Sequence, residues 1–141
     1  MAKPGRDFFK GKEVLFVGYS AKNNQFSKMV YQAFMDNGMK VYPLNNKADS
    51  SYDIKVYNKL ADLPKIPENA YVLLNRENAK SIVGTLAKTG VKRVLFQNKK
   101  NVDADILQEC QKQGMETAVA CPMMIYGKGM HKIHAFFAGV R

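Results

Sequence analysis

Apolar positions along this chain follow two different periods. Short apolar runs bounded by polar residues or glycine, such as residues 70–74, are typical of buried strands. Between these runs, apolar residues recur at helical spacing, as at Phe26, Met29, Val30, Ala33 and Phe34. The pattern predicts strands at residues 13–18, 39–44, 70–74, 91–97 and 115–120, helices at 26–37, 77–89 and 103–113, a helical turn at 57–62 and a short final helix at 130–138.

The predicted helices carry recognisable end signals. Asp103 is placed to accept hydrogen bonds as the N-cap of the third helix, and Gly38, Gly90 and Gly114 follow the helices at their carboxyl ends. Strands that alternate with helices and short turns predict parallel pairing with right-handed crossovers. We therefore expect an α/β protein, a single doubly wound Rossmann-like domain with a mainly parallel five-stranded sheet, in which residues 1–12 form an N-terminal extension and residues 13–141 form the domain.

Ligands of doubly wound sheets bind at the carboxyl ends of the strands. Four of the predicted strands end in polar or basic residues, at positions 18–20, 45–47, 75–76 and 97–99. The first of these ends leads into a helix, whose free amide groups and positive dipole end favour a phosphate. Gly18 permits close approach of a pyrophosphate and Ser20 offers a hydroxyl, although a single glycine in such a turn is also explained by sterics alone.

The motif of this turn departs from the dinucleotide fingerprint G-x-G-x-x-G, because Ser20 and Asn23 replace the second and third glycines. If Gly18 touches the ligand, Gly18→Val is expected to abolish binding and to leave the fold intact. The second strand is not followed by the acidic residue that binds the ribose of NAD, so NAD is disfavoured. Lys47 suits a phosphate on the ribose, as in CoA or NADP, and a solvated loop lysine is the alternative.

The order of these motifs resembles a known group, the small CoA-binding proteins with a Rossmann-like domain, which are related to the CoA-binding domain of the succinyl-CoA synthetase alpha subunit. The resemblance covers residues 14–126, and its motifs are VLFVGYS at 14–20, GMKVYPLN at 38–45 before Lys47, KLADLP at 59–64, Asn75-Arg76, LFQ at 95–97 and Ala120-Cys121-Pro122. Two departures are Asn46, where the family commonly has proline, and Asn98-Lys99, where it commonly has a small turn containing glycine.

The resemblance implies roles for seven residues. Gly18, Tyr19, Ser20 and Lys22 would lie against the pyrophosphate, Lys47 near the 3′-phosphate, and Asn75 and Arg76 near the adenosine, with Arg76 equally able to cap the next helix. Asn45 and Gln97, which stand in the shared motifs, complete the expected CoA-binding set: Gly18, Tyr19, Ser20, Lys22, Asn45, Lys47, Asn75, Arg76 and Gln97. The family also has a cysteine at the position of Cys121, which is a reactive thiol or, more commonly for such a residue, a structural one.

Composition narrows the class of protein and of partner. The 141 residues are 46% hydrophobic and 24% charged, and no apolar run is long enough to span a membrane. The start of the chain lacks the apolar stretch of a signal peptide, so we expect a cytoplasmic protein with Cys110 and Cys121 as free thiols. The formal charge of +10 favours an anionic partner, but the cations are scattered, which disfavours nucleic acid.

No catalytic set stands out. His131 and His134 lack a third metal ligand, so no metal is expected. Tyr126-Gly127-Lys128 does not have the Tyr-x-x-x-Lys spacing of a proton-relay pair, which disfavours the alternative of an NADP-dependent oxidoreductase or another protein that binds a nucleotide cofactor. We therefore expect a non-catalytic, stand-alone protein that binds CoA or acyl-CoA as a carrier, sensor or regulatory module, and the sequence leaves open whether it forms a homodimer.

Overall fold

The strands and helices alternate along the chain, as the apolar pattern predicts. The computed structural model describes residues 7–20, 25–47, 52, 54–100 and 102–126. Its elements are β1 (Glu13–Val17), α1 (Gln25–Asp36), β2 (Lys40–Leu44), the 3-10 turn η1 (Leu60–Asp62), β3 (Asn69–Val72), α2 (Arg76–Lys88), β4 (Arg93–Phe96), α3 (Ala104–Lys112), β5 (Glu116–Val119) and α4 (Pro122–Tyr126).

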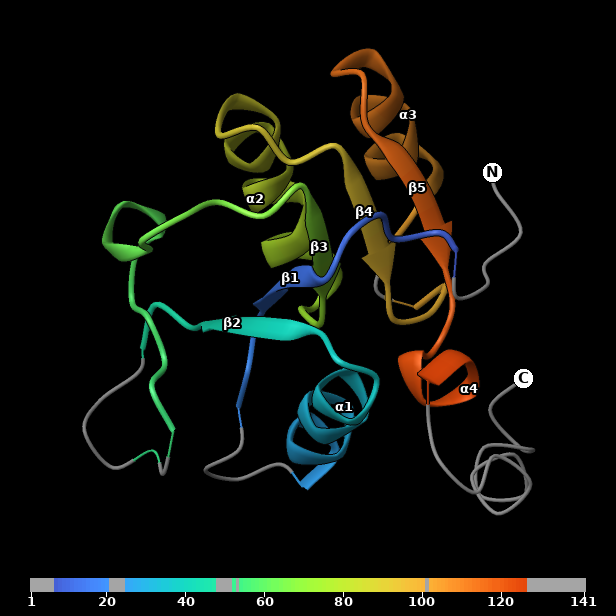
Figure 1. Ribbon diagram of the computed structural model, residues 1–141. Helices are drawn as coiled ribbons and strands as arrows, with labels where there is room; N and C mark the ends of the chain where they lie inside the picture. The colour runs from blue at the N-terminus through green and yellow to red at the C-terminus, as the bar shows by residue number, and fades with distance from the viewer. Residues whose placement is uncertain (1–6, 21–24, 48–51, 53, 101, 127–141) are drawn as a thin grey trace.

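The described strands form one sheet with the order β2-β1-β3-β4-β5, and all of its pairs are parallel. Figure 1 shows α1 and α4 on one face of the sheet and α2 and α3 on the other. The chain therefore leaves β1 toward one face and leaves β3, its neighbour, toward the other. This arrangement confirms the doubly wound Rossmann-like fold and places its switch point between β1 and β3.

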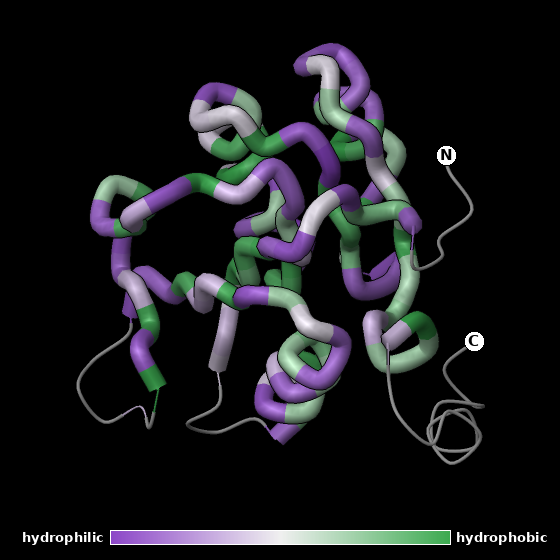
Figure 2. Tube along the Cα trace, viewed as in Figure 1, coloured by the Kyte–Doolittle hydropathy of each residue, from purple (hydrophilic) through white to green (hydrophobic). Residues whose placement is uncertain are grey.

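Alternation along each strand divides the core into two layers. In β1, Val14 and Phe16 pack in the layer beneath α1 and α4, whereas Leu15 and Val17 pack beneath α2 and α3. Hydrophobic stretches follow the strands and hydrophilic ones the outer turns (Figure 2). Both faces of the strands are buried, which explains why they read as continuous apolar runs instead of alternating ones.

The described part of the crossover from β2 to β3, residues 54–68, runs as a strap whose one helical element is η1. Tyr57 forms an isolated parallel bridge with Leu44: the Asn45 N–H donates to the Tyr57 carbonyl at 2.9 Å, and the Tyr57 N–H donates to the Pro43 carbonyl at 2.9 Å. The strap thus covers the outer edge of β2. Its helical part, η1, is shorter than the predicted turn at residues 57–62.

Two features of the helices differ from the prediction. α4 was not predicted, although Pro122 at its first position is a usual helix-start residue. Met29 belongs to the apolar repeat of α1 but is 39% exposed. The buried residues of that helix are Ser27, Val30, Ala33 and Phe34. The predicted N-cap at Asp103 is confirmed, since its carboxylate accepts the Ile106 N–H at 2.9 Å. The predicted helix at residues 130–138 lies outside the described residues.

A buried asparagine ties the amino ends of three strands together. The Asn69 side-chain amide donates to the backbone carbonyls of Lys10 at 2.7 Å and Glu13 at 2.8 Å, and its oxygen accepts from Arg93 Nε at 2.8 Å. The residues before β1 also reach the core, where Phe8 is buried together with Phe9. The chain ahead of residue 13 is therefore packed on the domain from at least Phe8 onward.

Candidate functional site

A cavity of about 540 Å³ opens at the carboxyl ends of β1 and β2, beside the switch point. It lies on the α2 face of the sheet. Its walls come from three parts of the chain: the ends of β1 and β2, the strap with η1, and α2. The lining residues are Val17, Gly18, Leu44, Asn45, Asn46, Lys47, Asn58, Leu60, Leu74, Asn78, Ser81, Ile82 and Thr85.

Gly18 is held tightly between the strands on either side of β1. Its N–H donates to the Leu44 carbonyl at 2.8 Å, and its φ of +95° is one that side chains disfavour. A Cβ at this position would lie 2.2 Å from the Leu73 carbonyl oxygen. The expectation that Gly18→Val leaves the fold intact is therefore wrong, because any side chain here collides with backbone.

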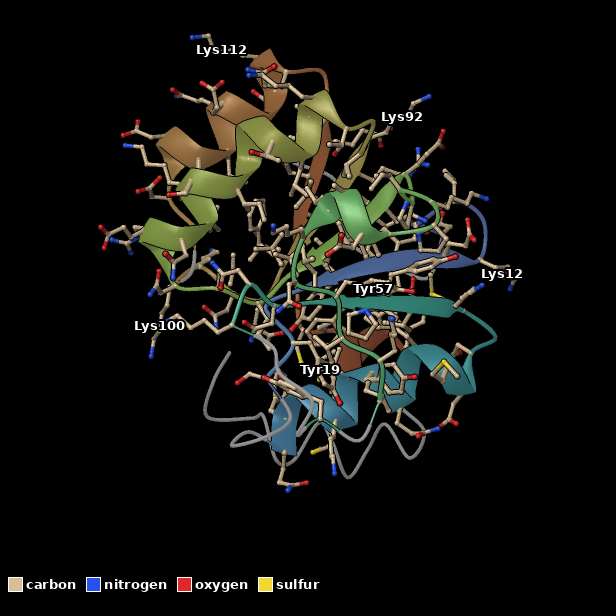
Figure 3. The ribbon with its side chains drawn as sticks, turned by 90° about the vertical axis from the view of Figure 1, so that its left-hand side faces the viewer. Lys12, Tyr19, Tyr57, Lys92, Lys100 and Lys112 are labelled. Carbon is tan, nitrogen blue, oxygen red and sulfur yellow. The ribbon has the colours of Figure 1, made fainter. Side chains whose placement is uncertain are left out.

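The residues after Gly18 turn away from the cavity. The Tyr19 ring is 1% exposed and packs on the α1 face, with ring centroids 5.3 Å from Phe16 and 5.8 Å from Tyr31. Figure 3 shows Tyr19 between the sheet and α1. The N–H of Ser20 donates to Ser27 Oγ at 3.2 Å. The backbone N–H groups of residues 18, 19 and 20 thus all have partners within the protein, and Lys22 lies outside the described residues.

Asn45 and Lys47 shape the rim of the cavity after β2. The Asn45 side-chain amide donates to the Tyr19 carbonyl at 2.7 Å, and its oxygen accepts the Lys47 N–H at 2.8 Å. One side chain therefore fixes both the turn after β1 and the turn after β2. Lys47 is exposed, and it is the one titratable side chain among the described lining residues.

Asn75 and Arg76 stand at the start of α2, next to the cavity but outside its lining. Asn75 is the N-cap, since its side chain accepts the Asn78 N–H at 2.8 Å. Arg76 is exposed, with its Nε 3.9 Å from a carboxylate oxygen of Asp103. Both residues have structural partners here, and the cap is Asn75 and not Arg76.

Gln97 lies on the opposite face of the sheet from the cavity. It is 7% exposed, and its side-chain oxygen accepts a hydrogen bond from the Tyr71 hydroxyl. Burial raises the pKa of Tyr71 well above its ordinary value. Burial also raises the pKa of the Cys121 thiol, and a hydrogen bond with Gln97 opposes that shift. Gln97, Tyr71 and Cys121 thus form a polar cluster in the α1 layer, separate from the cavity.

Both cysteines are free thiols, as predicted. Cys110 is buried in the α2 and α3 layer, where burial raises its pKa to about 11. Within the described ranges no group of three or more His, Cys, Asp or Glu residues is arranged to hold a metal ion. His131 and His134 lie beyond those ranges.

The sequence did not single out the wall that α2 contributes. Asn78, Ser81, Ile82 and Thr85 line the cavity and were not named as candidates, although their spacing places them on one stripe of the helix. Recognising that stripe from sequence would require knowing which side of α2 faces the end of β2.

None of the described helices is long and apolar enough to cross a membrane.

A family model shows the family of this chain, and solved structures show its fold. The family model described as a CoA binding domain matches residues 12–127. A hypothetical protein from Pyrococcus horikoshii OT3 is 22% identical with a TM-score of 0.69, over 91% of this chain and 84% of that one. A protein from Thermus thermophilus is 14% identical with a TM-score of 0.70, over 86% and 89% of the two chains.

A larger protein also contains this fold. An acetyl-coenzyme A synthetase from Ca. Korarchaeum cryptofilum is 20% identical with a TM-score of 0.64. The match covers 79% of this chain and 26% of the synthetase. At these identities the solved structures establish the fold alone.

Proposed function

Because this chain belongs to the family of CoA binding domains, we propose that it binds coenzyme A or acyl-CoA in the cavity beside Gly18 and Lys47, without catalysis of its own. The observation that carries the proposal is the position of the cavity. It opens at the carboxyl edge next to the switch point, where doubly wound folds bind nucleotides. Its volume of about 540 Å³ is within the usual range for a small-molecule site.

Lys47 is the residue that we assign to the 3′-phosphate of coenzyme A. It is exposed on the rim of the cavity. Its backbone is held in place because the Lys47 N–H donates to the Asn45 side-chain oxygen at 2.8 Å. An ammonium group pairs with a phosphate as a point charge, without a demanding geometry. Gly18 lines the same cavity and has no side chain, so the pyrophosphate is assigned to the position beside Gly18 and not to Tyr19 and Ser20, which do not line the cavity.

The chemistry of the lining supports binding rather than catalysis. Apart from Lys47, the described lining residues are apolar, amide or hydroxyl side chains, and none forms a pair of acid and base with it. A general acid or base must be within hydrogen-bond reach of the reacting atoms. The acetyl-coenzyme A synthetase has this fold in 26% of its length, which is consistent with a module that binds its coenzyme for chemistry located elsewhere.

The test is a calorimetric titration of the protein with CoA, dephospho-CoA, NADP and NAD at physiological salt. Saturable binding of CoA with little response to NADP supports the proposal. No binding of CoA refutes it, and tighter binding of NADP than of CoA favours the oxidoreductase alternative instead.

A variant at Lys47 tests the assignment of the phosphate. Lys47→Ala should weaken CoA by about 10- to 100-fold, because a hydrogen bond to a charged group contributes about 1.5–3 kcal/mol, and should change dephospho-CoA affinity by less than about 3-fold. Lys112→Ala is the matched control, since Lys112 is exposed at the end of α3, far from Tyr57 and the strap (Figure 3). Equal losses for CoA and dephospho-CoA would remove the assignment.

A further inference from the structure

The cavity continues beyond the edge of the sheet, along α2. Asn78, Ser81, Ile82 and Thr85 line it at spacings of three, four and seven residues, so they form one stripe of the helix. Seven residues of α-helix span about 10 Å. Asn58 and Leu60 of the strap and η1 belong to the same lining. We call this part of the cavity the α2 lobe, made of Asn58, Leu60, Asn78, Ser81, Ile82 and Thr85.

The α2 lobe has a different chemistry from the rim. None of its six residues is charged, so a phosphate would find no cation there. Leu60 and Ile82 are half-buried apolar side chains, whereas Asn78, Ser81 and Thr85 are exposed and offer one amide and two hydroxyls. A simple acyl chain would cover these polar groups without bonding to them, which is unfavourable. A purine base has apolar faces and hydrogen-bonding edges, so it satisfies both kinds of side chain.

We propose that the α2 lobe is the base-recognition subsite of the coenzyme A site, in which Asn78 selects adenine over guanine; this inference rests on the proposed function. Leu60 and Ile82 contact the faces of the base. The carboxamide of asparagine can bond in two places with adenine, to the N6 amino group and to N7. Guanine presents two acceptors at the equivalent positions and does not match the same pairing.

The order of groups along the cavity agrees with this orientation. In coenzyme A the ribose carries the 3′-phosphate and the pyrophosphate, and the base projects from the opposite side. The cavity has its cation, Lys47, at the sheet edge together with Gly18, and its uncharged lobe along α2. A ligand with its base in the α2 lobe therefore has its 3′-phosphate and its pyrophosphate at the edge of the sheet where Gly18 and Lys47 lie.

The experiment measures the affinity of the full chain for CoA, adenosine 3′,5′-bisphosphate and guanosine 3′,5′-bisphosphate. The wild type should prefer the adenosine compound over the guanosine compound by at least about 10-fold, as expected for a bidentate contact. Asn78→Ala should reduce that preference to less than about 3-fold. Ser81→Phe fills the lobe and should weaken CoA and adenosine 3′,5′-bisphosphate together, by about 30-fold or more, as expected when a ring occupies the space of the base. Gln111→Ala and Gln111→Phe are the controls, since Gln111 is exposed on α3 and away from the cavity lining.

Each outcome separates this inference from the proposed function. If Ser81→Phe weakens CoA but not adenosine 3′,5′-bisphosphate, the lobe holds the pantetheine arm and the inference is overturned. It is also overturned if the wild type binds CoA but not the adenosine compound, or if Asn78→Ala leaves the base preference unchanged. If the wild type binds none of the three ligands, the proposed function itself fails.

Discussion

Gly18→Ala is the substitution with the sharpest consequence for the fold around the site. The alanine Cβ would lie 2.2 Å from the Leu73 carbonyl oxygen and 2.8 Å from Leu74 Cδ2, whereas ordinary contacts begin at 3.4 Å. The Leu73 backbone would have to retreat by more than an ångström. It is held in place, because its N–H donates to the Val17 carbonyl at 2.9 Å.

The magnitude follows from two separate costs. An L-residue in the left-handed region loses about 1–2 kcal/mol, and forcing an extra group into a packed site costs about 1–3 kcal/mol. We expect Gly18→Ala to lose about 2–5 kcal/mol of unfolding free energy, which is a large part of the total for a domain of this kind.

Gly90→Ala isolates the conformational cost from the steric one. Gly90 has a φ of +103°, close to the +95° of Gly18, but a Cβ there meets nothing within 4 Å. It should therefore lose only the conformational part, about 1–2 kcal/mol. Urea denaturation of the two variants and the wild type measures the difference. Equal losses would show that contact with Leu73 is not what excludes a side chain at Gly18.

Two further predictions concern the sheet and its thiols. Asn69→Ala removes three hydrogen bonds, those to the Lys10 and Glu13 carbonyls and that from Arg93 Nε, while Arg93 keeps its contact with Glu68. It should therefore lose about 3–5 kcal/mol in urea denaturation; a loss below about 1 kcal/mol would show that water replaces the amide. At pH 8 a thiol reagent should modify Cys121 slowly and Cys110 only after unfolding, because burial raises both pKa values. The pKa of the Cys110 thiol is about 11 in the folded protein, above the ordinary 9.0. The stability that the protonated thiol contributes is therefore complete below pH 9 and is lost as pH rises through 11. The melting temperature of Cys110→Ala should fall less steeply than that of the wild type between pH 8 and 11.

The sequence by itself determined the elements and the class of fold. Apolar runs and helical repeats are local, so their periods identify the strands and the three long helices to within a few residues. The N-cap at Asp103 is local in the same sense. The same locality explains the errors: α4 has only five residues, too few to show a period, and Met29 stands at the margin of the buried stripe of α1.

The tertiary structure alone decided which residues meet in the cavity. Gly18 and Tyr19 are neighbours in the sequence, yet Gly18 lines the cavity and the Tyr19 ring is buried on the other face. Gln97 follows β4 as Lys47 follows β2, but the Gln97 side chain lies in the α1 layer, where it accepts a hydrogen bond from the Tyr71 hydroxyl. Which face a residue occupies depends on the strand order and on the side of each crossover. Those are set by pairing between distant parts of the chain, and no local period records them.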